Sequence, residues 1–176
     1  RGGTAVDVGT GSGAIALALA SEGNFGRVVA TDVSTDALAV ARANAARCAS
    51  ALTGRVEFRA GDAVAPVQDL AGEVDVIVSN PPYIAFAEAR ELPASVRDWE
   101  PPQALVCPDD GLEVSRRIVS GGGALLRPGG LLAFETDSRR AGRLADLVRA
   151  DGAYVDVRVL PDLTGRDRFV LATRRA

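Results

Sequence analysis

The chain has 176 residues, 47% of them hydrophobic, and a mean hydropathy of +0.11. A chain of this size and apolar content can bury one substantial core but hardly two, so we expect a single domain over residues 1–176. Its 20 basic residues, all of them Arg, are outnumbered by 23 acidic residues. This mild negative charge disfavours nucleic acid or an anionic membrane as a partner.

Other features of the composition set further limits. No stretch reaches the roughly 20 apolar residues that span a bilayer, and no signal-peptide pattern precedes the first strand, so we expect a soluble, cytoplasmic protein. Cys48 and Cys107 have neither metal-ligand spacing nor a disulfide framework, and we expect reduced packing residues and no metal site. The chain has no Met and its first strand begins almost at Arg1, which indicates an excerpt of a longer protein.

The hydrophobic pattern alternates strands with helices. The first half predicts strands at 4–8, 27–31, 55–59 and 74–78, with helices at about 12–21 and about 34–50, the second of them capped by Ser34. The second half predicts a helix at 112–126 ended by Pro128-Gly129-Gly130, a strand at 131–136, a helix at 139–150, and a closing strand pair at 154–160 and 168–173.

Strict alternation of this kind predicts an α/β fold with parallel strands, right-handed crossovers and helices on both faces of the sheet. Ligands in that architecture collect at the carboxyl ends of the strands, near the switch in strand order. The most irregular segment, 85–110, is rich in Pro and acidic residues and follows such an end, where long loops are usually functional.

The segment Asp7–Gly13, Asp-Val-Gly-Thr-Gly-Ser-Gly, joins the first strand to the first helix. Its glycines permit a tight turn and bring backbone N–H groups at a helix N-terminus close to a ligand. Asp32 ends the second strand, about twenty residues further on, and can accept both hydroxyls of a ribose. On this motif alone a nicotinamide or flavin cofactor remains an alternative, because Gly9, Gly11 and Ala14 also fit the dinucleotide fingerprint.

Two further acids bear on the choice of cofactor. Asp7 lies just inside the end of the first strand, where a carboxylate suits a cofactor with a cationic amino-acid tail better than one with an anionic pyrophosphate. Asp62, at the end of the third strand, could accept a hydrogen from an adenine amino group, although a solvated turn acid is an equally good interpretation.

The tetrapeptide Asn80-Pro81-Pro82-Tyr83 follows the fourth strand and favours methyl transfer to an amide or amino nitrogen over hydride transfer. Successive prolines cannot donate ladder hydrogen bonds and restrict the preceding residue, so the strand must end at Asn80 with a rigid, extended backbone. Because the lone pair of an amide nitrogen is delocalised, an enzyme must bind both N–H hydrogens and aim the nitrogen at the methyl group. Asn80 Oδ1 and the Pro81 carbonyl can supply the two acceptors.

The remaining parts of this motif fit the same chemistry. The Tyr83 ring can stack on the planar group and favour a cationic methyl donor through its π face. The proton lost from the nitrogen becomes acidic as the new bond forms, so a His base is dispensable, which suits a chain with no His. The alternative is a Pro-rich loop that merely ends a strand.

Together these residues resemble the release-factor glutamine methyltransferases of HemK/PrmC type over nearly the whole chain. The glycine loop and the Asn-Pro-Pro-Tyr signature mark the wider class of S-adenosylmethionine-dependent amide and amino methyltransferases. The more specific matches are Ile84, Glu100-Pro101, Ala104-Leu105, Asp110-Gly111-Leu112, Leu163, Gly165 and Arg168.

The resemblance implies a Rossmann-like class I methyltransferase with a mostly parallel, seven-stranded sheet. It implies transfer of a methyl group from S-adenosyl-L-methionine, leaving S-adenosyl-L-homocysteine, to N5 of the glutamine in the Gly-Gly-Gln motif of class 1 peptide chain release factors. Glu100 to Leu105 would border the substrate entrance. Carried over by position, the catalytic residues are Asn80, Pro81, Pro82 and Tyr83, and the cofactor-binding residues are Asp7, Gly9, Thr10, Gly11, Ser12, Gly13, Asp32, Asp62, Ala63 and Asn80.

The chain departs from the family pattern in three places. The N-terminal helical domain that helps to dock the release factor is absent from this chain. Ala63 stands where the family often has an aromatic residue beside the adenine, which predicts a lost stacking contact. Thr136-Asp137 stands where the family usually continues Ile-Gly after Glu135.

Two other functions stay open on the sequence. An exocyclic amino group of a nucleobase presents the same planar nitrogen to Asn-Pro-Pro-Tyr, although an enzyme of that kind normally needs a basic track and a recognition domain. A non-catalytic cofactor-binding scaffold is the third possibility.

Overall fold

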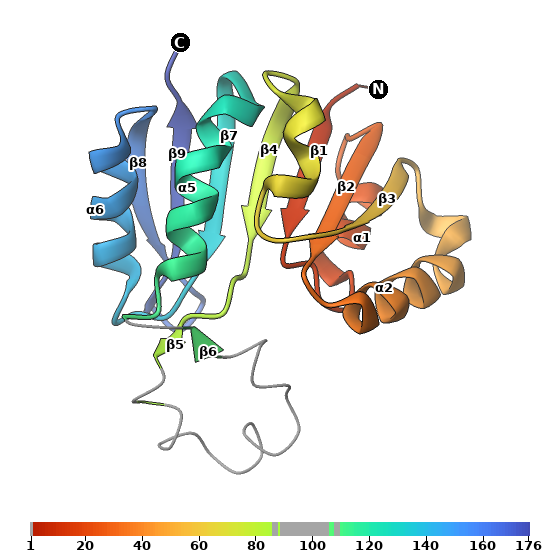
Figure 1. Ribbon diagram of the computed structural model, residues 1–176, viewed down its shortest axis with the longest axis horizontal. Coiled ribbons are helices and arrows are strands. Elements are labelled where there is room, and N and C mark those ends of the chain that lie inside the picture. The colour runs from red at the N-terminus through yellow and green to blue at the C-terminus, as the bar shows by residue number, and fades with distance from the viewer. Residues whose placement is uncertain (1, 86–87, 89–105, 108–109) are drawn as a thin grey trace.

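In the computed structural model, which describes residues 2–85, 88, 106–107 and 110–176, seven strands form one sheet in the order β3-β2-β1-β4-β7-β9-β8 (Figure 1). Strand β9 runs antiparallel to both of its neighbours, and the other strands of this sheet are parallel to one another. The predicted mostly parallel sheet with a closing antiparallel pair is therefore confirmed. The strands are β1 (Thr4–Val8), β2 (Arg27–Asp32), β3 (Arg55–Ala60), β4 (Val74–Ser79), β7 (Leu126–Glu135), β8 (Tyr154–Pro161) and β9 (Asp167–Arg174).

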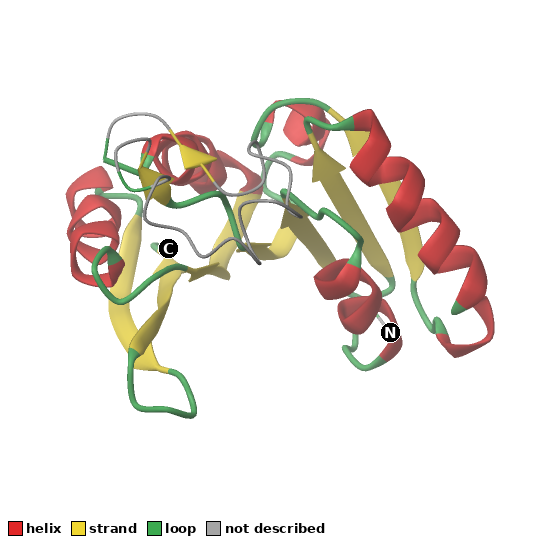
Figure 2. Ribbon diagram, turned by 90° about the horizontal axis from the view of Figure 1, so that it is seen from below, coloured by secondary structure: helices red, strands yellow, loops and turns green. Residues whose placement is uncertain are grey.

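Helices lie on both sides of the sheet, as Figure 2 shows. Alternation along β1 explains why both faces are buried: Val6 belongs to the core under α5 and α6, whereas Ala5 belongs to the core under α1. The helices are α1 (Ala14–Ser21), α2 (Thr35–Arg47), α5 (Glu113–Leu125) and α6 (Ala141–Asp151), with short 3-10 helices η1 (Ala49–Ala51) and η2 (Ala65–Leu70). None of the helices described is long and apolar enough to cross a membrane.

The strand order reverses at β1, which pairs with β2 on one side and with β4 on the other. After β1 the chain continues into one half of the sheet, and after β4 it continues into the other half. A crevice therefore forms between the carboxyl ends of β1 and β4. Ser79, the last residue of β4, donates its hydroxyl to the Val8 carbonyl at 2.7 Å and ties the two strand ends together.

The predicted stop at Pro128-Gly129-Gly130 is wrong in detail. Helix α5 ends at Leu125, and β7 begins at once with Leu126, so the Pro-Gly-Gly segment lies within the strand. Leu126 pairs with Val74 and Leu131 pairs with Val76, and the residues between them bulge out of register with β4. Gly129 accommodates this bulge with a φ of 78°.

Other element boundaries shift by a few residues. Helix α1 begins at Ala14 rather than near position 12, because Gly13 has a left-handed φ of 86°. Helix α2 stops at Arg47 and is followed by η1, so the helix expected up to about position 50 is shorter. Strand β4 ends at Ser79, one residue before Asn80.

The segment 85–110, expected to be irregular, includes residues of two short strands. Strand β5 (Ile84–Ala85) pairs in parallel with β6 (Val106–Cys107) as a separate two-stranded sheet. The positions between, apart from Glu88, lie outside the described residues. Figure 1 shows β5 and β6 below the carboxyl edge of the main sheet, near the lower ends of α5 and α6.

Candidate active site

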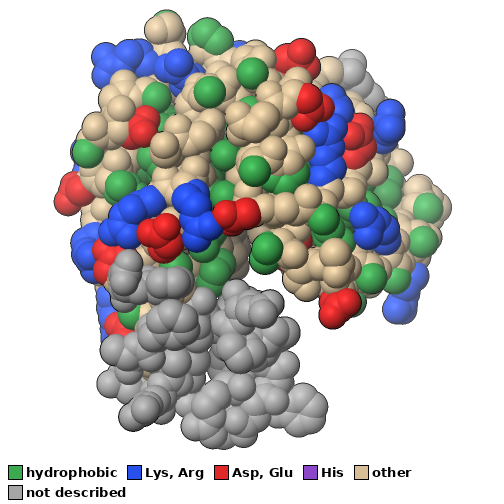
Figure 3. Space-filling view, viewed as in Figure 1, with side chains coloured by type: hydrophobic (Ala, Val, Ile, Leu, Met, Phe, Trp, Pro, Cys, Tyr) green, Lys and Arg blue, Asp and Glu red, His purple; other side chains and the backbone are tan. Residues whose placement is uncertain are grey.

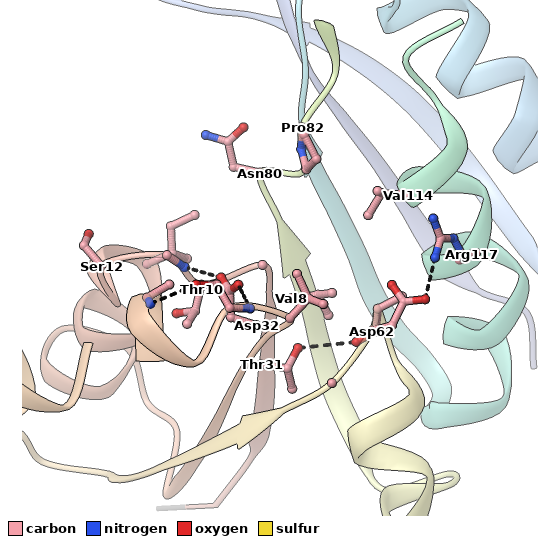
Figure 4. A pocket seen from close by; sticks show the side chains of 18 of the residues that line it. Val8, Thr10, Ser12, Thr31, Asp32, Asp62, Asn80, Pro82, Val114 and Arg117 are labelled. Carbon is pink, nitrogen blue, oxygen red and sulfur yellow. Dashed lines mark hydrogen bonds and ion pairs between the residues drawn. The ribbon is translucent and has the colours of Figure 1, made fainter. Parts of the chain in front are cut away.

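A cavity of about 840 Å³ lies at the carboxyl ends of β1, β2 and β4 (Figure 4). Its size is that of a small-molecule or cofactor site. The lining comes from the end of β1, the glycine loop, the start of α1, the segment from the end of β2 into α2, the turn after β3, the segment after β4, β6 and α5. It consists of Val8, Gly9, Thr10, Gly11, Ser12, Ala14, Ile15, Thr31, Asp32, Val33, Ser34, Ala37, Gly61, Asp62, Ala63, Asn80, Pro82, Cys107, Val114 and Arg117.

The glycine loop adopts backbone angles that suit glycine. Gly9 and Gly11 have φ values of 74° and 56°, and a Cβ at either position would meet nothing within 4 Å. The amides of Gly9 and Thr10 both donate to the Thr31 carbonyl at 2.9 Å, which fixes the loop against the end of β2. The loop is therefore held on its sheet side, and its glycines leave open space where other residues would carry side chains.

Asp7 lies behind this loop and is not among the lining residues. Its side chain is fully buried, and Oδ2 accepts hydrogen bonds from Thr10 Oγ1 at 2.6 Å and from the Ala16 amide at 3.0 Å. Burial raises the pKa of Asp7 to about 6, against the lowering effect of these two hydrogen bonds. The carboxyl group thus joins the loop to the first turn of α1, and its predicted role beside a cationic tail stays a prediction.

Asp32 lines the cavity and connects two elements. Its Oδ2 accepts the Gly11 amide at 2.9 Å and its Oδ1 accepts the Ser34 amide at 2.8 Å. Ser34 in turn caps α2 by accepting the Ala37 amide at 3.2 Å. One carboxylate therefore fixes both the glycine loop and the start of α2 at the edge of the cavity.

Asp62 lies in the turn beyond β3, which ends at Ala60, and not in the strand itself. It forms an ion pair with Arg117 of α5, and both residues line the cavity (Figure 4). Ala63 follows with a φ of 46°, and its carbonyl lies 3.4 Å from Thr31 Oγ1. The predicted partner of Asp62 was an adenine amino group, and that role remains a prediction.

Sequence reasoning missed Arg117 and the side of the cavity that α5 forms. Arg117 Nε also lies 3.5 Å from Oε1 of Glu113, four residues earlier in α5. That spacing was visible in the sequence, but it indicates only one face of a helix. Both cysteines were expected to be reduced packing residues. Cys107 is free and buried and also lines the cavity, whereas Cys48 is free but exposed, so the packing role predicted for Cys48 is wrong.

The four residues after β4 divide between the cavity and the protein interior. Asn80 is exposed and lines the cavity together with Pro82, and Figure 4 shows both at the end of β4. Pro81 is buried, and Tyr83 is half-buried with the Arg168 guanidinium 5.9 Å from its ring centroid. The segment Glu100 to Leu105, expected at the substrate entrance, lies outside the described residues.

The strand order reverses at β1, a glycine loop lies at this switch point, and Asn-Pro-Pro-Tyr follows β4. These features together define a Rossmann-like methyltransferase of class I. Residues 1–94 match the model of the methyltransferase small domain family, and the chain belongs to that family.

Two curated relatives are similar to this chain over nearly its whole length. The chain is 49% identical to a release factor glutamine methyltransferase of Moorella thermoacetica over 98% of its own length and 59% of that protein. It is 47% identical to one of Cereibacter sphaeroides over 96% of its length and 59% of that protein. The chain thus spans about three fifths of these curated relatives.

Solved structures are similar in fold. A methyltransferase from Pyrococcus furiosus gives a TM-score of 0.71 at 21% identity, covering 100% of this chain and 77% of that one. The ribosomal protein L11 methylase of Lactobacillus delbrueckii subsp. bulgaricus gives 0.67 at 21% identity, covering 100% and 72%.

Proposed function

We propose that the protein transfers a methyl group from S-adenosyl-L-methionine to N5 of the glutamine in the Gly-Gly-Gln motif of class 1 peptide chain release factors. The observation that carries the proposal is that Asn80 and Pro82 line the same cavity as the glycine loop and Asp32. The names of the relatives above supply the substrate class. Release factors act in the cytoplasm, and we place the protein there.

The residues that line the cavity fit the cofactor. Asp32 offers a carboxylate for ribose hydroxyls, and the glycine loop gives close access to backbone N–H groups at the start of α1. Val33 and Ile15 add apolar surface to the lining, and Val33 is 68% exposed. When bound, the cofactor supplies an electrophilic methyl group on a sulfonium sulfur.

The acceptor side is formed by the chain's own residues. Asn80 Oδ1 and the Pro81 carbonyl accept the two N–H hydrogens of the glutamine amide and orient the nitrogen. Methyl transfer to the amide held by Asn80 and Pro81 would form a nitrogen–carbon bond, break the sulfur–carbon bond of the cofactor, and release one proton from the nitrogen to solvent. Pro81 and Pro82 keep the acceptors in a fixed backbone conformation, which lowers the entropy lost on binding the amide.

Mass spectrometry of an unmethylated release factor, incubated with S-adenosylmethionine and the protein, tests the proposal. The assay uses both this chain and the full-length gene product. We expect one added methyl group on the Gly-Gly-Gln glutamine, and a loss of about 100-fold or more in kcat for Asn80→Ala, as for removal of a group that orients the reacting atoms.

Asn24→Ala is the matched control. Asn24 is exposed in the turn before β2, at the amino end of that strand, and its variant should methylate at the wild-type rate. Methylation of RNA or DNA, with binding that weakens steeply with salt, would favour a nucleobase methyltransferase instead. Cofactor binding without turnover on any amide substrate would favour the scaffold.

A further inference from the structure

Arg140, at the start of α6, has a buried guanidinium, and each of its three nitrogens has an acceptor. The residue is 4% exposed. Its Nη1 donates to Asp137 Oδ2 at 2.6 Å, its Nε donates to the Asp110 carbonyl at 3.0 Å, and its Nη2 is paired with Glu88 Oε2. Two carboxylates therefore balance one buried cation, the condition under which burial of such a charge is tolerated.

These partners come from chain segments on either side of positions 89–109. Glu88 follows β5, and its Oε2 also accepts the Ala85 amide at 3.2 Å. Asp110 lies in the turn that leads into α5. The guanidinium thus joins the segment that leaves Asn-Pro-Pro-Tyr to the segment that enters α5, and it holds both against the start of α6.

Tyr83 is packed into the same cluster through its backbone. Gly111 has a φ of 80°, and a Cβ there would lie 2.2 Å from the Tyr83 carbonyl oxygen and 2.4 Å from Arg140 Nε. The Gly111 backbone consequently fills the space between Tyr83 and Arg140, and only glycine fits. A shift of Arg140 or of the Asp110 turn would reach Tyr83 directly.

We propose that Arg140 is a positioning residue for the acceptor-binding segment Asn80–Tyr83. This inference rests on the proposed function. Pro81 and Pro82 fix the beginning of the segment, whereas Arg140 fixes its far end through Glu88, Asp110 and the contact with Gly111. The amide acceptors at Asn80 and Pro81 are then held at both ends, as orientation of a poorly nucleophilic nitrogen requires.

The geometry demands arginine in particular. Three acceptors in different directions are met by the fork of one guanidinium, and the single ammonium of lysine cannot reach them all. Figure 3 shows Arg and acidic side chains mixed over this end of the molecule. Arg139, which also pairs with Glu88, has a side chain that is 70% exposed. Arg143 supplies a matched control because it also pairs with Asp110, although its side chain is 58% exposed.

The test compares Arg140→Lys, Arg140→Gln and Arg143→Gln with the wild type, in the full-length gene product and in this chain. Three quantities are measured: kcat for release-factor methylation, the Kd for S-adenosylmethionine by calorimetry, and hydrogen–deuterium exchange of a peptide covering 83–88. For Arg140→Gln we expect a loss in kcat of about tenfold or more, because misorientation of reacting groups is costly. Its Kd should stay within about twofold, and exchange in 83–88 should be faster while a peptide from α1 is unchanged.

Arg140→Lys should fall between Arg140→Gln and the wild type, and Arg143→Gln should match the wild type in all three quantities. Unchanged exchange in 83–88 with unchanged kcat would overturn the inference. A Kd that rises in step with the fall in kcat would also overturn it, because that result means general damage to the domain. If the wild type does not methylate release factors, the proposed function fails, whereas the exchange comparison still decides whether Arg140 orders the segment.

Discussion

The Arg168 guanidinium lies over the Tyr83 ring, 5.9 Å from its centroid, and its Nη2 donates to Glu135 Oε1 at 2.8 Å. Arg168 is near the start of β9, and Glu135 ends β7. The residue therefore connects the closing antiparallel pair to the last residue of Asn-Pro-Pro-Tyr. In this arrangement the cation faces one side of the ring and Glu135 keeps the cation in place.

Replacing Arg168 should loosen Tyr83 and weaken acceptor binding. We expect Arg168→Leu to raise KM for a release-factor substrate by roughly 3- to 30-fold, the range that corresponds to loss of one cation–π contact. Arg168→Lys should recover part of the loss. Steady-state kinetics measures the effect, with Arg166→Gln in the same hairpin as the control. An unchanged KM in Arg168→Leu would show that the contact does not support the acceptor site.

Asp32→Asn should weaken cofactor binding. The asparagine keeps one oxygen acceptor but places an NH₂ group against either the Gly11 amide or the Ser34 amide, both of which now donate to the carboxylate. Loss of a charge-assisted hydrogen bond predicts roughly 10- to 100-fold weaker binding. Calorimetry with S-adenosylhomocysteine gives the Kd directly. Asp36→Asn, in the first turn of α2, is the control and should bind normally.

Asp7 predicts a pH dependence of stability. Burial raises its pKa to about 6 in the folded protein, whereas an unfolded Asp titrates near its ordinary value of about 4. Between about pH 4 and about pH 6 the folded state therefore keeps a proton that the unfolded state has lost. The contribution of Asp7 to the free energy of unfolding is fully present below about pH 4 and is lost as the pH rises through about 6. The whole contribution is about 3 kcal/mol.

Asp7→Asn removes this titration and keeps the size of the side chain. The free energy of unfolding of the wild type, relative to that of the variant, should fall by roughly 1.5 kcal/mol between about pH 5 and about pH 7.5. Urea unfolding at the two pH values measures this difference. Any constant cost of the new amide cancels in the comparison. If the free energy of unfolding changes equally with pH in the wild type and in Asp7→Asn, Asp7 is ionised in the folded protein over this whole pH range.

Gly13→Ala should destabilise the glycine loop. Gly13 has a φ of 86°, and an added Cβ would lie 3.1 Å from Ala41 Cβ in α2. We expect a cost of about 1–2 kcal/mol from the left-handed backbone alone. Gly142→Ala is the control: this glycine lies in α6, and a Cβ there would meet nothing within 4 Å. That variant should gain up to about 1 kcal/mol, and thermal unfolding distinguishes the two.

The order of the elements followed from the sequence because it depends on local chemistry. Hydrophobic spacing predicted the seven strands and their helices, and the prolines at 81 and 82 predicted the end of β4 to within one residue. The bulge at Pro128-Gly129-Gly130 was missed, because local turn residues read as a stop whereas pairing of β7 with β4 begins before them.

The sequence by itself determined the glycine loop, the acid at the end of β2 and the rigid tetrapeptide Asn80–Tyr83, since each is a short motif whose backbone and side-chain chemistry lie close together in the chain. Only the tertiary structure decided that Asp7 lies behind the loop, that Arg117 pairs with Asp62, and that Arg140 joins Glu88 to the Asp110 turn. Those contacts bridge residues from different elements. Their formation depends on how the crossovers stack helices on the sheet, and no local spacing encodes which side chains then meet.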